Sequence, residues 1–108
     1  MIVRIVRMQF RPEGLAEFEA LFQQTKDKIR AFPGCLHLQL LGDAGIAEVR
    51  YTLSHWASEA DLEAYRQSEL FQATWAATKP LFEAKPMAFS LQPLPEHSLT
   101  QITGNERA

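Results

Sequence analysis

The side chains of this sequence that could do chemistry gather around the segment Ser54-His55-Trp56, which closes an alternating apolar run. Directly behind it, the run from Ala57 to Phe71 begins as a helix would. The tryptophan therefore falls where a sheet meets helices. Pockets for flat, partly apolar ligands form between such layers and are lined by aromatic side chains with few polar groups. The sequence predicts a pocket of this kind beside Trp56.

Several titratable and aromatic residues could act on a ligand in that pocket. An imidazole titrates near neutral pH and could serve as a base. A guanidinium could hold an anion, and aromatic rings could sandwich a flat ligand. The candidates are His55 and His37 for the base, Arg50 for the anion, and Trp56, Tyr65 and Trp75 for the ring.

Each of these residues also has a structural interpretation. Strand alternation places Trp56 on one face and His55 on the other, unless a bulge at the strand end reverses the direction. Trp75 falls on the apolar face of a predicted helix, where a large aromatic side chain packs into a core. Both histidines could be hydrogen-bonded structural residues or dimer contacts. Arg4 and Arg7 could reach the rim of the domain along their aliphatic stems.

Length, charge and cysteine content restrict the class of protein. A chain of 108 residues is one domain, and its 11 basic and 13 acidic residues form no basic run that would bind nucleic acid. The single Cys35 excludes a disulfide framework and a cysteine metal cluster. No signal peptide, membrane span, zinc spacing, phosphate loop or hydrolase motif is present. We therefore expect a soluble, cytoplasmic protein without a metal site.

The first half of the chain predicts a strand, a helix and a hairpin. Residues 2–10 are apolar at both alternating positions, as in a strand buried on both faces. Apolar residues then recur at helical spacing from Leu15 to Phe32, and Pro33-Gly34 ends that helix. The runs 35–41 and 47–56 alternate on either side of turn residues, with Leu36, Leu38 and Leu40 sharing one side of the first run.

The second half predicts two capped helices and a last strand. Ser58 and Asp61 have the spacing of a helix cap, and a second helix follows from Ser68 until Pro80 removes a backbone donor. Residues 86–91 form the last strand, and residues 94–108 form a polar tail that is expected to fray.

The order strand, helix, strand, strand, helix pair, strand is that of a ferredoxin-like α+β sandwich. Its helices cover one face of a four-stranded antiparallel sheet and leave the other face open. Because several strands are apolar on both faces, the open face needs a cover, and a second copy of the chain can supply it. We predict a homodimer in which the two sheets pack face to face.

Four motifs now identify a family resemblance over roughly residues 1–93. They are Phe10-Arg11-Pro12-Glu13-Gly14, Phe32-Pro33-Gly34-Cys35, His55-Trp56-Ala57-Ser58 and Ser68-Glu69-Leu70-Phe71. With them the chain resembles the antibiotic biosynthesis monooxygenase domain of the dimeric α+β barrel superfamily. The family includes cofactor-free oxygenases of phenols and quinols, relatives that open haem, and members with no assigned activity.

The haem-opening members use an asparagine on the first strand and a histidine on the last helix. In the family register these positions carry Arg7 and Trp75 in this chain. Without that histidine the usual axial iron ligand is missing, unless His37 or His55 supplies one from the sheet. The resemblance therefore disfavours a haem-degrading role.

The resemblance leaves two functions open. The first is a cofactor-independent monooxygenase of a small phenol-like or quinol-like molecule, with His55 or His37 as the base and Arg7 or Arg50 holding the anion. The second is a non-catalytic dimer that binds a small ligand or serves as an accessory subunit. The first requires a closed pocket beside Trp56 with a titratable group, whereas in the second Trp56, Trp75 and Phe71 fill that space.

Overall fold

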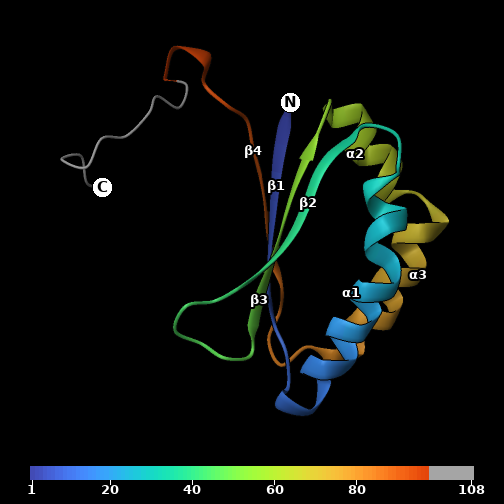
Figure 1. Ribbon diagram of the computed structural model, residues 1–108, viewed down its shortest axis with the longest axis vertical. Coiled ribbons are helices and arrows are strands. Elements are labelled where there is room, and N and C mark those ends of the chain that lie inside the picture. The colour runs from blue at the N-terminus through green and yellow to red at the C-terminus, as the bar shows by residue number, and fades with distance from the viewer. Residues whose placement is uncertain (98–108) are drawn as a thin grey trace.

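A computed structural model describes residues 1–97 of the chain, so most of the predicted tail lies outside the described residues. Figure 1 shows a sheet with all three α-helices on one side of it. The elements follow the order β1 (Ile2–Gln9), α1 (Leu15–Arg30), β2 (Cys35–Gly42), β3 (Val49–Trp56), α2 (Glu59–Arg66), α3 (Glu69–Thr78) and β4 (Met87–Leu91). The strands are antiparallel in the order β2-β3-β1-β4. The predicted ferredoxin-like fold is confirmed.

The two serine caps begin α2 and α3 as the sequence predicts. The Ser58 hydroxyl accepts a hydrogen bond from the Asp61 amide, and the Ser68 hydroxyl accepts one from the Phe71 amide, each at 3.1 Å. Such caps satisfy backbone donors that the first helical turn cannot pair internally. At the other end of α3, Pro80 lies in a short 3₁₀ turn, Lys79–Leu81, that ends the helical run.

Gly34 connects α1 to the sheet and brings β2 close to α2. Its φ of 87° lies in the left-handed region, and a Cβ built there would lie 2.4 Å from the side chain of Asp61. Its carbonyl accepts a hydrogen bond from the Ala57 amide at 2.8 Å. Only glycine combines this backbone conformation with this close approach. The helix itself ends at Arg30, two residues before the predicted Phe32.

Strand register divides the sheet residues between two faces. In the β1·β3 pairing Arg4 lies opposite Ser54 and Val6 opposite Thr52, and these positions face the helices. One expectation on β2 is wrong, because Leu36 does not share a face with Leu38. A bulge between Cys35 and His37 makes Leu36 the extra residue, and its side chain is 49% exposed.

Two apolar clusters fill the ends of the space between sheet and helices. One forms at the start of β1 from Ile2, Cys35, Trp56 and Leu62, with Phe32 and Tyr65 packed against it. The other forms at the end of β1 from Met8, Phe10, Phe18 and Leu81, with Phe22 and Phe82 among its neighbours. Between these clusters the two layers enclose a cavity.

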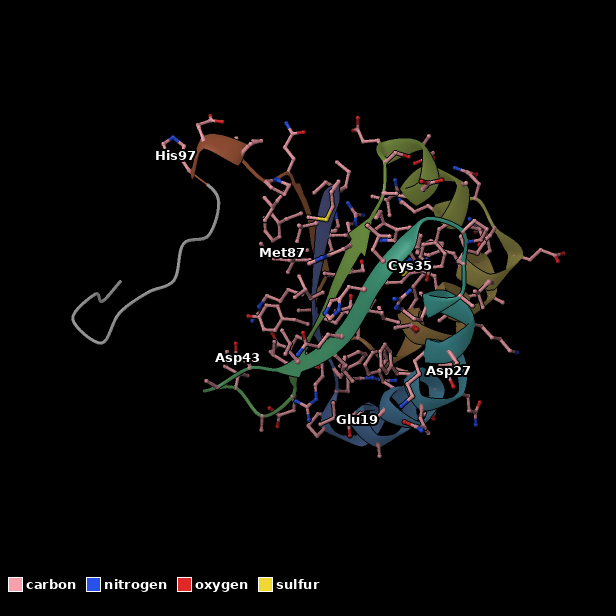
Figure 2. The ribbon with its side chains drawn as sticks, turned by 45° about the horizontal axis from the view of Figure 1, so that its top comes forward. Glu19, Asp27, Cys35, Asp43, Met87 and His97 are labelled. Atoms are coloured by element: carbon pink, nitrogen blue, oxygen red, sulfur yellow. The ribbon has the colours of Figure 1, made fainter. Side chains whose placement is uncertain are left out.

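The opposite face of the sheet carries no helix from residues 1–97. Met87, Phe89 and Leu91 alternate along β4 on this face and remain 45–49% exposed, and Figure 2 shows Met87 on the side away from α1. We call this surface the open face. The predicted homodimer through it stays a prediction. Within the described part of the chain, no helix has the length and apolar character needed to cross a bilayer.

Candidate functional site

A cavity of about 360 Å³ lies between the sheet and the three helices. We call it the central cavity. Its volume falls within the roughly 300–1,000 Å³ of small-molecule pockets. The sheet contributes Arg4, Val6, Met8, Leu38, Thr52, Ser54, Trp56 and Ala88. The helices contribute Phe18, Leu21, Phe22, Thr25, Ile29, Leu62, Tyr65, Arg66, Phe71, Thr74, Trp75 and Thr78. A pocket therefore lies beside Trp56.

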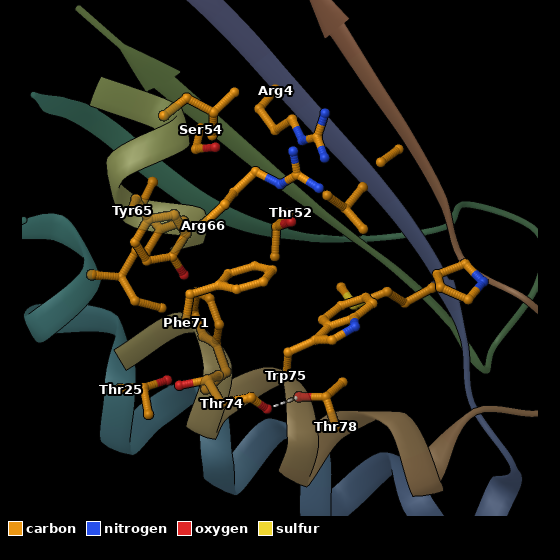
Figure 3. A pocket seen from close by; sticks show the side chains of 18 of the residues that line it. Arg4, Thr25, Thr52, Ser54, Tyr65, Arg66, Phe71, Thr74, Trp75 and Thr78 are labelled. Atoms are coloured by element: carbon orange, nitrogen blue, oxygen red, sulfur yellow. Dashed lines mark hydrogen bonds between the residues drawn. The ribbon is translucent and has the colours of Figure 1, made fainter. Parts of the chain in front are cut away.

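An aromatic wall runs along one side of the central cavity. It consists of Trp56, Tyr65, Phe71 and Trp75, whose consecutive ring centroids lie 4.9, 5.3 and 5.9 Å apart. Figure 3 shows the last three of these rings projecting into one space. Aromatic pairs at these separations are attractive, and their faces offer a surface on which a flat ring can stack.

The two tryptophans have different surroundings. Trp56 is 1% exposed, belongs to the first apolar cluster, and donates its indole N–H to the Ser54 hydroxyl at 3.0 Å. Trp75 is only half-buried on α3 and points its indole toward the middle of the cavity (Figure 3). Trp56 therefore closes one end of the cavity as a core residue, whereas Trp75 presents a ring to a ligand.

Two arginines are the charged groups that line the central cavity within the described part of the chain. Arg4 of β1 donates to the Ser90 hydroxyl at 2.8 Å, and Arg66 at the end of α2 pairs with Glu63 at 3.3 Å. Burial, and after it the neighbouring Arg66 cation, lowers the pKa of Arg4. Among residues 1–97, no carboxylate, imidazole or thiol side chain lines this cavity. The cavity is thus apolar with a cationic region at one end.

The structure brings together only some of the residues singled out from the sequence. Trp56, Tyr65 and Trp75 meet in the aromatic wall, and their predicted role in ligand binding stays a prediction. His55 and His37 face each other across β3 and β2 with ring centroids 5.0 Å apart, at positions that alternate with the cavity-facing ones. Successive side chains of a strand point to opposite faces of the sheet. Because Ser54 and Trp56 face the cavity, the imidazoles lie on the open face.

The two predicted anion-holding arginines also lie outside the central cavity. Arg7 lies on the open face of the sheet, because it alternates with the cavity-facing residues of β1, and it pairs with Tyr51 of β3. Arg50 has the same parity as Trp56 but lies at the start of β3, where it forms an ion pair with Glu19 at 2.8 Å. Their predicted roles, like those of the histidines, stay predictions.

Arg4 and Arg66 were not among the expected site residues, although the position of each in the sequence indicated that it faces the interior. Arg4 has the same strand parity as Val6 and Met8, which places it on the helix-covered face. Arg66 follows Leu62 by one helical turn and so shares the inward side of α2. A cation at a cavity-facing position of an apolar strand is a functional signal in its own right.

Tyr65 provides a pH-dependent prediction. Burial raises the pKa of its hydroxyl from 10.0 to about 12. The folded state therefore favours the neutral phenol. Its contribution to stability is present below pH 10 and is lost as the pH rises through about 12. Urea unfolding of the wild type should show this loss, and Tyr65→Phe should flatten it. Tyr51→Phe is the matched control, and an equal flattening there would contradict the assignment.

The family model for antibiotic biosynthesis monooxygenases matches residues 1–77, a range that spans β1 to α3 and nearly all of the cavity lining. The chain belongs to the antibiotic biosynthesis monooxygenase family. No curated protein matches the sequence significantly.

Solved structures of the family share this fold. One antibiotic biosynthesis monooxygenase is 19% identical with a TM-score of 0.82, and the match covers 88% of this chain and 100% of that one. A candidate family member from Caulobacter crescentus CB15 is 28% identical with a TM-score of 0.81, over 86% of this chain and 89% of its own. A protein from Mycobacterium tuberculosis is 24% identical with a TM-score of 0.81, and the match covers 90% of this chain and 98% of that one.

Proposed function

We propose that this family member is a cofactor-independent monooxygenase that oxidises a small phenol-like or quinol-like aromatic molecule in the central cavity. The proposal is carried by one observation. Three rings of the aromatic wall lie next to the guanidinium groups of Arg4 and Arg66, namely those of Tyr65, Phe71 and Trp75. The wall suits a flat ring, and the guanidinium groups suit the negative charge that forms when a phenol ionises.

The proposed reaction begins with ionisation of the substrate. Since no carboxylate or imidazole of residues 1–97 lines the cavity as a proton acceptor, water takes the hydroxyl proton, and the nearby arginine cations lower the pKa of the phenol. The phenolate passes one electron to O₂, and the resulting radical pair joins at a ring carbon as a peroxide. Protonation and loss of water then leave a quinone. Phenol and O₂ thus give quinone and water, with one oxygen atom in each product.

A haem group fits this cavity poorly. Among residues 1–97, no histidine lines the central cavity, because His37 and His55 face the other side of the sheet.

Oxygen uptake by the purified, metal-stripped protein tests the proposal. With a panel of quinols, anthrones and polyphenols, we expect turnover on at least one substrate. Trp75→Ala should lower kcat/KM by about tenfold or more because the ring loses its stacking surface, and Trp75→Phe should restore most of it. His55→Ala should retain the rate if water accepts the proton.

Two results would redirect the proposal. Loss of turnover in His55→Ala would contradict a reaction in the central cavity, because His55 lies on the other face of the sheet. The absence of oxygen uptake on every substrate, despite ligand binding, would favour the alternative of a non-catalytic binding protein. Among the described cavity residues no carboxylate or imidazole could act as a general base, and this observation favours the alternative.

We also propose that two chains associate through the open face. Members of this family are commonly dimeric. Met87, Phe89 and Leu91 expose three large apolar side chains in a row on β4, next to Ile5 of β1. An apolar patch of this kind on a small protein marks an interaction site, and a sheet packed on its own copy would cover it.

A further inference from the structure

Two arginines from different layers of the fold approach one another at one end of the central cavity. Arg4 comes from β1, and Arg66 comes from the last turn of α2. Figure 3 shows their guanidinium groups next to each other above Thr52. The nearby Arg66 cation contributes to the lowered pKa of Arg4, after burial. Two like charges in a partly apolar site repel each other, and a bound anion would relieve that repulsion.

The described residues neutralise this pair only weakly. The hydrogen bond of Arg4 goes to a neutral hydroxyl, that of Ser90. The ion pair of Arg66 with Glu63 is 3.3 Å long, with both side chains about half exposed, and such pairs contribute little. Glu59 and Glu63 line a shallow polar hollow outside, together with both arginines, but neither glutamate lines the central cavity. On the cavity side the two guanidinium groups present uncompensated positive charge.

We propose that Arg4 and Arg66 recognise a carboxylate on the aromatic ligand while its ring lies along Phe71 and Trp75. Guanidinium groups bind carboxylates through paired, charge-assisted hydrogen bonds that a lysine cannot reproduce. Both arginines and both rings line the same cavity of about 360 Å³, a volume within the range of small-molecule pockets. This inference rests on the proposed use of the central cavity as the ligand site, and it narrows the substrate class to aromatic acids.

The test compares two probes that differ in charge and scarcely in shape, 2-naphthoate and 2-naphthamide, by isothermal titration calorimetry. The wild type should bind the naphthoate about tenfold more tightly. Arg66→Gln and Arg4→Gln should each weaken naphthoate binding by about tenfold and change naphthamide binding by less than about twofold. Since Arg66 is exposed, its substitution tests the proposal even where a variant of Arg4 folds poorly.

Two further variants separate local recognition from overall charge. Lys28→Gln removes one positive charge from an exposed position on α1, outside the cavity, and should leave the naphthoate Kd unchanged. Glu63→Gln removes the competing carboxylate of Arg66 and should tighten naphthoate binding by about threefold. The naphthoate Kd should therefore rise in Arg66→Gln and fall in Glu63→Gln.

Three results would overturn the proposal. The wild type could bind both probes with equal affinity, or the arginine variants could lose affinity for both probes to the same extent. The third result is that neither probe binds at millimolar concentration. Its failure is distinguishable from failure of the proposed oxygenation, because oxygen uptake with a neutral quinol requires no carboxylate. Turnover of neutral quinols alongside equal probe affinities would leave the monooxygenase standing without acid recognition.

Discussion

Replacing Trp56 by alanine should lower the free energy of unfolding by about 3–5 kcal/mol, the range for a large buried aromatic side chain. Trp56 is 1% exposed and contacts Phe32 and Tyr65, with ring centroids 6.4 and 4.9 Å away. Its removal also leaves the buried Ser54 hydroxyl without the indole donor. Urea denaturation followed by far-ultraviolet circular dichroism measures the change without relying on tryptophan emission.

Trp75→Ala is the matched control for this prediction. Trp75 is half-buried and borders empty space, so its removal deletes fewer contacts and should cost roughly 1–2 kcal/mol. Its main effect should fall on ligand binding. Equal destabilisation by the two substitutions would contradict the division between a structural Trp56 and a ligand-facing Trp75.

Phe89→Arg should convert the proposed dimer to a monomer, with a dimer dissociation constant raised by roughly 100-fold or more. Phe89 lies at the centre of β4 on the open face, is 45% exposed, and pairs with Ile5 across the sheet. In a symmetric interface each substitution occurs twice, so two unpaired guanidinium groups would enter an apolar contact. Sedimentation velocity over a range of protein concentrations measures the result.

Gln23→Arg, at an exposed position of α1 on the other side of the fold, adds the same charge outside the proposed interface. This variant should remain dimeric. A monomeric wild type at about 100 µM, well above the dissociation constants of stable homodimers, would contradict the proposed interface. A Phe89→Arg protein that still forms the dimer would contradict it equally.

Much of the fold was predictable from local patterns. Alternation defined the strands, helical spacing defined α1 and α3, and the capping serines Ser58 and Ser68 marked where two helices begin. Pro33-Gly34 indicated the turn after α1, and the left-handed φ of Gly34 explains why glycine stands there. These features depend on neighbours within a few residues, which is why the sequence alone carries them.

Part of the site was also predictable. The run from Trp56 to Phe71 indicated an aromatic pocket between layers, and the structure places Trp56, Tyr65 and Trp75 together in the aromatic wall. Strand parity already suggested that His55 points away from Trp56, and the register confirms the alternation. The bulge at Leu36 could not be foreseen, because it depends on how β2 pairs with β3.

By itself the sequence determined the order of the elements, the family, and the set of aromatic side chains available for a ligand. Only the tertiary structure decided that Trp56 is core and Trp75 faces a cavity, since packing between layers determines which rings leave space. It also decided which arginines line the cavity. Arg4 and Arg66 are far apart in the chain, and their meeting depends on how α2 packs over the sheet, a long-range arrangement that no local spacing encodes.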